Sequence, residues 1–396
     1  STFISQLFCV YNSFSTLPLF PTTLSQSHMA TIPSGKGVSM LAAHDNTAMV
    51  SKVEIGRPAA GPSDVSIDIK YCGICHSDLH ATNGDWGVNL YPMAAGHEIA
   101  GIATAVGADV KGIKVGDRVG VGCMVGSCRT CDLCLSGLEQ HCPQMLQTYS
   151  AVFPDGKGDN YKDAVGHHTN GGYSTAITVD SHFVFALPDG LPMEYAGPLL
   201  CAGVTTFSPL NRYVLKAGGG KGKTVGVVGF GGLGHMAVKL AKAMGCEVVA
   251  ISRSESKKEE AAKLGAEILA HEDAEAVAAA ARKFDVIIDT VSAKHDVAPL
   301  VGMLKVGGKF VILGAPPGNF ELSAFALLFS RHSVEGSMIG GIPETKEMLE
   351  FCTEHMVLPD IKIIKASEVN EQLKALADGS ASAARAVIDI STIAEM

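Results

Sequence analysis

The chain has 396 residues, of which 47% are hydrophobic and 18% charged, and its formal net charge is -9. This length and composition are typical of a soluble enzyme with two or three domains and a large core. The sequence has no basic block to neutralise phosphates, which argues against nucleic-acid binding, and no run of about eighteen apolar residues that would span a membrane. We therefore expect a cytoplasmic protein.

Residues 1–37 form a leader of uncertain origin, and residues 1–28 contain no Asp, Glu, Lys or Arg. An acid-poor, serine-rich leader is similar to a transit peptide, but transit peptides are normally rich in arginine, and secretory signals begin with a basic region. Met29 is a candidate start. Organellar targeting by the leader is the alternative to a cytoplasmic location.

Short β-type runs separated by glycine, proline and aspartate turns follow the leader. Strands are predicted at 65–69, 99–106, 118–121 and 173–179. Such runs indicate a compact β-rich domain over residues 38–200. The tail contains predicted helices at 346–355 and 369–378 and a predicted strand at 386–390, so we assign residues 344–396 to the same domain.

Between these parts, apolar strands alternate with amphipathic helices. Strands are predicted at 224–228, 247–251, 286–289 and 310–313, and helices at 236–244, 257–264 and 297–304. This alternation is typical of an α/β domain with a doubly wound parallel sheet, which we place at residues 201–343.

A glycine motif, G-x-G-x-x-G, lies between the first of these strands and the first helix. Its glycines permit a tight turn, close approach of a pyrophosphate and close packing of helix on strand, while the helix N-terminus faces the anion. The motif predicts a dinucleotide site. Its residues are Gly229, Gly231, Gly232, Leu233 and Gly234.

The end of the next strand carries Ser252, Arg253 and Ser254, where an NAD site usually has an acidic residue that binds the ribose hydroxyls. The two hydroxyls, the guanidinium and Lys257 could together hold a 2′-phosphate. The sequence therefore favours NADP over NAD. In the alternative interpretation these basic residues only form a solvated face.

Four cysteines lie within fifteen positions: Cys128, Cys131, Cys134 and Cys142. Such short spacings can close a tetrahedral set of thiolates around one zinc ion. Disulfides would instead be typical of a short, secreted chain. We predict a structural zinc in a lobe formed by residues 123–142. Because all four coordination positions would be filled by cysteine, this site would not take part in catalysis.

A second group has the residue types of a catalytic zinc site, which needs three protein ligands and one open position. Cys75 and His97 supply two ligands. Cys201 is the candidate for the third, although a lone cysteine in apolar surroundings is often a buried core thiol.

In their order along the chain, these motifs resemble the zinc-dependent medium-chain alcohol dehydrogenases, and among them the cinnamyl alcohol dehydrogenase class and microbial broad-range NADP-dependent aldehyde reductases. The resemblance begins near Val38 and continues to the C-terminus. It rests on residues 73–80, on 96–110, on the four-cysteine lobe, on 200–205 and on 229–235. It implies a GroES-like catalytic domain beside a Rossmann domain.

The same resemblance assigns roles to individual residues. Cys75, His97 and Cys201 would hold the catalytic zinc, with Glu98 as an alternate ligand, and Asp78 would orient the His97 ring. Ser77 and His80 would carry the proton between the substrate and solvent. The metal would polarise the substrate oxygen.

The resemblance thus implies an enzyme with two zinc ions per chain that moves hydride between NADP(H) and a primary alcohol or aldehyde, aromatic or of medium chain length. It also implies a homodimer with an edge strand at 334–338. A polar insertion at 152–161 argues against assigning cinnamaldehyde as the natural substrate. Two alternatives stay open, an NAD-linked polyol or alcohol dehydrogenase and a non-enzymatic zinc and nucleotide binding redox sensor.

Overall fold

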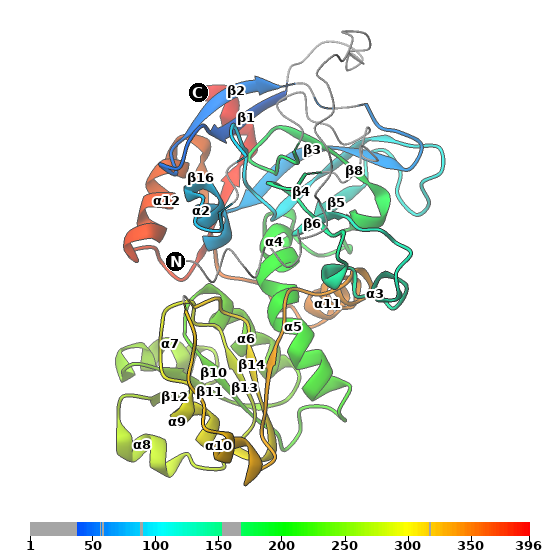
Figure 1. Ribbon diagram of the computed structural model, residues 1–396. Helices are drawn as coiled ribbons and strands as arrows, with labels where there is room; N and C mark the ends of the chain where they lie inside the picture. The colour runs from blue at the N-terminus through cyan, green and yellow to red at the C-terminus, as the bar shows by residue number, and fades with distance from the viewer. Residues whose placement is uncertain (1–37, 56, 58, 88–89, 153–167, 317) are drawn as a thin grey trace, which may run out of the picture. The chain divides into compact units, whose positions relative to one another are not determined.

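The computed structural model describes residues 38–396 except 56, 58, 88–89, 153–167 and 317 (Figure 1). The leader and most of the polar insertion therefore lie outside the described residues. The chain divides into two compact units. Among the described residues, the first unit comprises 38–187, 363–381 and 386–396, and the second comprises 188–362 and 382–385.

The first unit is built on a seven-stranded sheet in the order β16-β17-β3-β4-β5-β9, with β8 paired to β3. The long central strand β3 alternates buried residues such as Val65, Ile67 and Ile69 with more exposed ones, as a sheet with one covered face requires. The strands are β3 (Asp64–Gly73), β4 (Ile99–Val106), β5 (Arg118–Val121), β8 (Ala176–Asp180), β9 (Phe185–Ala186), β16 (Ile361–Lys365) and β17 (Arg385–Asp389).

Shorter elements complete this unit. The hairpin of β1 (Val38–Ala43) and β2 (Val50–Ile55) pairs antiparallel. Helix α2 (His76–Asn83) follows β3 directly, and α12 (Val369–Asp378) occupies the helix predicted in the tail. The four-cysteine lobe contains β6 (Met124–Gly126), α3 (Asp132–Leu135), a 3-10 turn at Glu139–His141 and β7 (Leu146–Gln147).

The C-terminal strand returns to the first unit. β17 pairs antiparallel with β3, with Val387 opposite Gly73 and Ile388 opposite Cys72. This confirms the prediction of a strand near 386–390. It also places the chain end against the strand that leads into Cys75.

The second unit contains a six-stranded parallel sheet in the order β12-β11-β10-β13-β14-β15. The chain runs from β10 outward to β12 and then returns to β13 on the other side of β10, so the strand order reverses between β10 and β13. In open sheets of this kind the ligand crevice lies outside the carboxyl ends of the strands at that reversal. The strands are β10 (Thr224–Val228), β11 (Glu247–Ser252), β12 (Glu267–Ala270), β13 (Phe284–Asp289), β14 (Leu304–Ile312) and β15 (Ser333–Gly336).

Helices connect these strands and precede them. The connecting helices are α6 (Gly232–Ala243), α7 (Lys258–Lys263), α8 (Ala274–Ala279), α9 (Ala298–Gly302) and α10 (Ala324–Leu328). Before the sheet, α4 (Met193–Pro198), a π-helical turn at Leu199–Gly203 and α5 (Val204–Leu210) follow one another without a break, and α11 (Ile342–Glu354) comes after β15. The predicted α/β fold class with a doubly wound parallel sheet is confirmed.

Two predicted elements differ in extent. The helix predicted at 297–304 ends at Gly302, because Leu304 already begins the long strand β14. The strand predicted at 173–179 begins only at Ala176, because the backbone N–H of Tyr173 donates to the Ala95 carbonyl and so belongs to a separate pairing. In the part of the chain that the structure describes, no helix is long and apolar enough to cross a membrane.

Candidate metal, catalytic and cofactor sites

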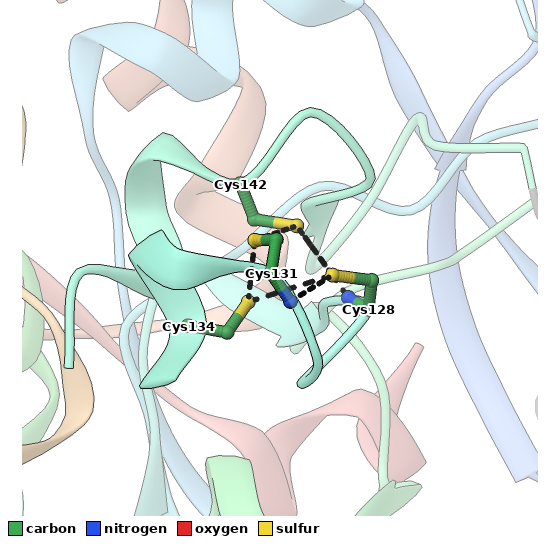
Figure 2. Close-up of side chains that lie close together, drawn as sticks. All are labelled: Cys128, Cys131, Cys134 and Cys142. Carbon is green, nitrogen blue, oxygen red and sulfur yellow. Dashed lines mark hydrogen bonds between the residues drawn. The ribbon is translucent and has the colours of Figure 1, made fainter. Parts of the chain in front are cut away.

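The four cysteines of the lobe point toward one another (Figure 2). Neighbouring sulfurs lie 3.5 Å apart between Cys128 and Cys142, 3.6 Å between Cys131 and Cys134, 3.8 Å between Cys128 and Cys134 and 3.9 Å between Cys131 and Cys142. Four thiolates bound to one zinc lie about 3.8 Å apart, whereas a disulfide would bring two sulfurs to about 2.0 Å. The donor set therefore fits a tetrahedral zinc.

Backbone N–H groups point at two sulfurs of the lobe, although burial raises the pKa of the Cys142 thiol to about 12. The N–H groups of Cys131 and Gln144 point at the sulfurs of Cys128 and Cys142, each 3.3 Å away. Backbone hydrogen bonds from Thr130 and Cys131 lower the pKa of the Cys128 thiol to about 6. A metal here would meet at least one ligand that is already ionised near neutral pH.

One ion pair and one histidine–carboxylate hydrogen bond connect the lobe to the rest of the first unit. The Arg129 guanidinium lies 2.8 Å from the Asp180 carboxylate at the end of β8, and His182 lies 3.0 Å from the buried Glu139. The lobe is thus fixed at both sides of α3 without contributing an open coordination position.

The second metal-capable group of the first unit consists of Cys75, His97 and Glu98. Their ligand atoms lie within 4.8 Å of one another, and all three residues are buried. Adjacent strands bring them together, since Cys75 follows β3, and His97 and Glu98 immediately precede β4. A Cβ atom on Gly73 would lie 2.0 Å from the Glu98 carboxylate, so only glycine leaves room for that side chain.

The Asp78 carboxylate holds this group in place. It caps α2 by accepting the Cys75 N–H at 2.7 Å, and it accepts the Gly96 N–H at 3.1 Å. Its Oδ1 lies 3.3 Å from Nδ1 of His97, which leaves Nε2 of that ring for a metal. The predicted orienting role of Asp78 therefore has a matching geometry.

Two tyrosines that the sequence analysis did not assign also belong to this network. The Tyr149 hydroxyl lies 3.2 Å from His97 Nδ1, and the Tyr173 hydroxyl donates to Asp78 Oδ2 at 3.0 Å. Burial, followed by the nearby Asp78 charge, raises the pKa of both phenols well above the usual value, so both stay protonated. The only feature of the sequence that could have pointed to either tyrosine is the Gly171-Gly172-Tyr173 run, and this run resembles an ordinary turn.

Ser77 and His80 lie on α2, one turn apart. The Ser77 hydroxyl is 3.7 Å from the Cys75 sulfur, and Nδ1 of His80 is 2.8 Å from the Asp85 carboxylate. Both side chains are partly exposed. Asp85, just beyond the end of α2, is a partner of His80 that the sequence analysis did not predict.

Cys201 belongs to the second unit, where it is buried within the π-helical turn Leu199–Gly203. Single π-helical turns inside α-helical segments are frequent at functional sites. The assignment of Cys201 as a zinc ligand stays a prediction.

The glycine motif forms the turn from β10 into α6. Gly229 has a φ of 86°, and Gly231 is the N-cap of α6, whose first turn contains Gly232, Leu233 and Gly234. A Cβ atom on Gly234 would lie 2.2 Å from the Gly229 carbonyl, so the close approach of helix and strand requires glycine. The N–H groups of this helix start are available to a phosphate.

Ser252 ends β11, the strand next to β10, and Arg253 and Ser254 follow it. Lys257 Nζ donates to the Phe230 carbonyl at 2.7 Å, within the glycine turn itself. Glu255, the nearest carboxylate in sequence, pairs with Lys258 at 2.9 Å. The residues predicted to hold a 2′-phosphate thus all lie at or after the carboxyl end of β11, and the Lys257 side chain reaches the turn after β10.

A β-rich unit with a four-cysteine lobe and a buried Cys, His and Glu group, together with a doubly wound unit that carries a dinucleotide motif, defines a zinc-binding dehydrogenase. Residues 61–189 match the alcohol dehydrogenase GroES-like domain, and residues 232–354 match the zinc-binding dehydrogenase family. The chain belongs to the zinc-dependent medium-chain alcohol dehydrogenases, in their cinnamyl alcohol dehydrogenase-like class. The predicted family and fold are confirmed.

Similar proteins come from bacteria and plants. NADP-dependent alcohol dehydrogenase C 1 of Mycolicibacterium smegmatis is 50% identical over 337 residues, which cover 84% of this chain and 93% of the relative. 8-Hydroxygeraniol dehydrogenase of Catharanthus roseus is 49% identical, with coverages of 85% and 90%. Among solved structures, a cinnamyl alcohol dehydrogenase of Sorghum bicolor has a TM-score of 0.82 at 41% identity and covers 90% of this chain and 98% of its own.

Proposed function

We propose that this chain transfers a hydride between NADP(H) and a primary alcohol or aldehyde, with aromatic and terpenoid alcohols as the substrate class. The observation that carries the proposal is the buried Cys75, His97 and Glu98 group in a chain that also has a dinucleotide motif. The relatives that act on 8-hydroxygeraniol and cinnamyl alcohol support the substrate class.

Each part of the chain has a defined task in this reaction. Cys75, His97 and Cys201 would hold a zinc ion, which when bound polarises the substrate oxygen, and Glu98 is an alternate ligand. Ser77 would accept the alcohol proton on its hydroxyl oxygen while releasing its own hydroxyl proton to a relay that ends at His80, and His80 would pass a proton to solvent. Asp85, at 2.8 Å from Nδ1 of His80, keeps the imidazole oriented.

The preference for NADP follows from charge at the end of β11. Arg253 and Lys257 supply two cations, and the hydroxyls of Ser252 and Ser254 supply hydrogen bonds to a 2′-phosphate. The NADP-dependent relative of Mycolicibacterium smegmatis and a cinnamyl alcohol dehydrogenase of Helicobacter pylori in complex with NADP(H), 38% identical with a TM-score of 0.78, support this choice.

A second candidate function has one observation in its favour. A probable mannitol dehydrogenase of Fragaria ananassa is 47% identical over 343 residues, and an NAD-linked polyol dehydrogenase was an alternative from the sequence. The absence of a carboxylate among residues 252–254 disfavours it.

The test is a spectrophotometric assay of NADPH and NADH oxidation with aliphatic, aromatic and terpenoid aldehydes and with a ketose. We expect chelator-sensitive turnover with NADPH and aromatic or terpenoid aldehydes. Turnover with NADH and a ketose alone would support the polyol enzyme. A folded, metal-loaded protein without any reductase activity would support the redox sensor.

We also propose a homodimer formed through the nucleotide-binding units. β15 is the edge strand of its sheet. The preceding helix α10 carries the exposed apolar residues Phe325 and Leu328, and the exposed Phe329 is its C-cap. An exposed apolar patch beside an open sheet edge is typical of a protein interface.

The cytoplasmic location stays a prediction, which expression of fluorescent fusions with and without residues 1–28 would test.

A further inference from the structure

We infer that Tyr173 is a positioning residue for the catalytic metal site, acting on His97 and Cys75 through the Asp78 carboxylate. This inference rests on the proposed catalytic zinc. It adds a residue that lies 95 positions from Asp78 along the chain and contacts none of the reacting atoms.

The contacts of Asp78 define the route. Oδ1 of the carboxylate faces the Gly96 N–H and His97 Nδ1, and Oδ2 accepts the Cys75 N–H and the Tyr173 hydroxyl. Each carboxylate oxygen thus has at least two partners, and the Tyr149 hydroxyl also hydrogen-bonds to this carboxylate, so its roughly four acceptor sites are filled. Because both oxygens are occupied, the carboxylate cannot rotate without losing hydrogen bonds to both metal-ligand segments.

Tyr173 is itself held rigidly. Its side chain is fully buried, and its backbone N–H donates to the Ala95 carbonyl at 3.0 Å, two residues before His97. The buried Arg57 guanidinium donates to the carbonyls of Asn170 and Gly171 at 3.0 and 3.1 Å and so fixes the segment that leads to Tyr173. The phenol hydroxyl is therefore held in position to donate its hydrogen bond, and the raised pKa keeps it protonated.

Removal of the Tyr173 hydroxyl would deprive Oδ2 of one donor and leave it the Cys75 N–H. The carboxylate could then tilt, and the bond from His97 Nδ1 to Oδ1 would weaken. Partners of metal-ligating histidines orient the ring and raise its basicity, and their loss typically costs about 10–100-fold in metal affinity or activity. For a residue one contact further from the metal, we expect a smaller loss of roughly 3–10-fold.

The test compares Tyr173→Phe with the matched control Tyr91→Phe. The Tyr91 hydroxyl donates to the Thr82 carbonyl at 2.7 Å in the same unit and does not contact the Asp78 carboxylate, although the Thr82 hydroxyl donates to the Asp78 backbone carbonyl. Both variants lose one tyrosine hydrogen bond and should have similar Tm values. Cobalt would replace zinc, and its visible absorption spectrum and its release to a chelator would be recorded. We expect Tyr173→Phe alone to shift the cobalt bands and to release one of two metal ions about 3–10-fold faster.

Equal spectra and release rates for the two variants would overturn the inference. A double-mutant cycle with Asp78→Asn tests the route, because Tyr173→Phe should then add little to the effect of the asparagine variant. Full additivity would contradict action through Asp78. Activity and metal content of the unaltered enzyme test the proposed function separately, since those results do not depend on the tyrosine variants.

Discussion

At the scale of single residues, the positive charge of Arg253 is expected to determine the preference for NADP over NAD. Arg253→Asp replaces a cation that would bind the 2′-phosphate by an anion that would repel it. A charge-assisted hydrogen bond contributes about 1.5–3 kcal/mol, so we expect the KM for NADPH to rise roughly 10–100-fold. The KM for NADH should change far less. Steady-state kinetics with both cofactors will check this, and an equal effect on the two would contradict the NADP assignment.

Cys75 is a proposed ligand of the catalytic zinc, so its removal should abolish the metal-dependent reaction. We expect Cys75→Ala to lose the catalytic zinc, so that metal analysis finds one zinc per chain in place of two, and to lower kcat by at least about 100-fold, more than the loss of an outer partner costs. Cys246→Ala, which removes a buried thiol of the second unit, is the control and should keep both ions. Two zinc ions in a folded Cys75→Ala protein would contradict the ligand assignment.

At the scale of elements, we expect the four-cysteine lobe to depend on its metal, since none of the residues of α3 is buried. Cys131→Ser should remove the structural zinc and leave the catalytic one. A loss of about 2 kcal/mol corresponds to roughly 4–8 °C in Tm for a unit of this size. Calorimetry with zinc analysis will measure both effects. Ser136→Ala, which removes a hydrogen bond at the end of α3 and no ligand, is the control, and an unchanged Tm for Cys131→Ser would show that the lobe holds without metal.

At the scale of the whole molecule, assembly depends on the apolar end of α10. Phe329 is 82% exposed, and a second copy of the chain would cover it. We expect Phe329→Asp to convert a dimer into a monomer by analytical ultracentrifugation. Met356→Asp, at a comparably exposed apolar position after α11, should stay dimeric. A monomeric unaltered protein would refute the homodimer.

The family resemblance supplied the set of Cys75, His97 and Cys201. Local pattern in the sequence by itself determined the fold class, the dinucleotide motif and the four-cysteine group. These features depend on short spacings, as in Cys128 to Cys142, or on regular periodicity, as in β10 and α6, and neither needs knowledge of distant contacts. Only the tertiary structure revealed that Tyr149 and Tyr173 join Asp78 and His97, and that Asp85 orients His80. Those partners meet because β3 and β4 bring Cys75 and His97 together and residues 170–173 pair with 94–96. A hydrogen bond between residues far apart in the chain leaves no period or spacing from which it could be predicted.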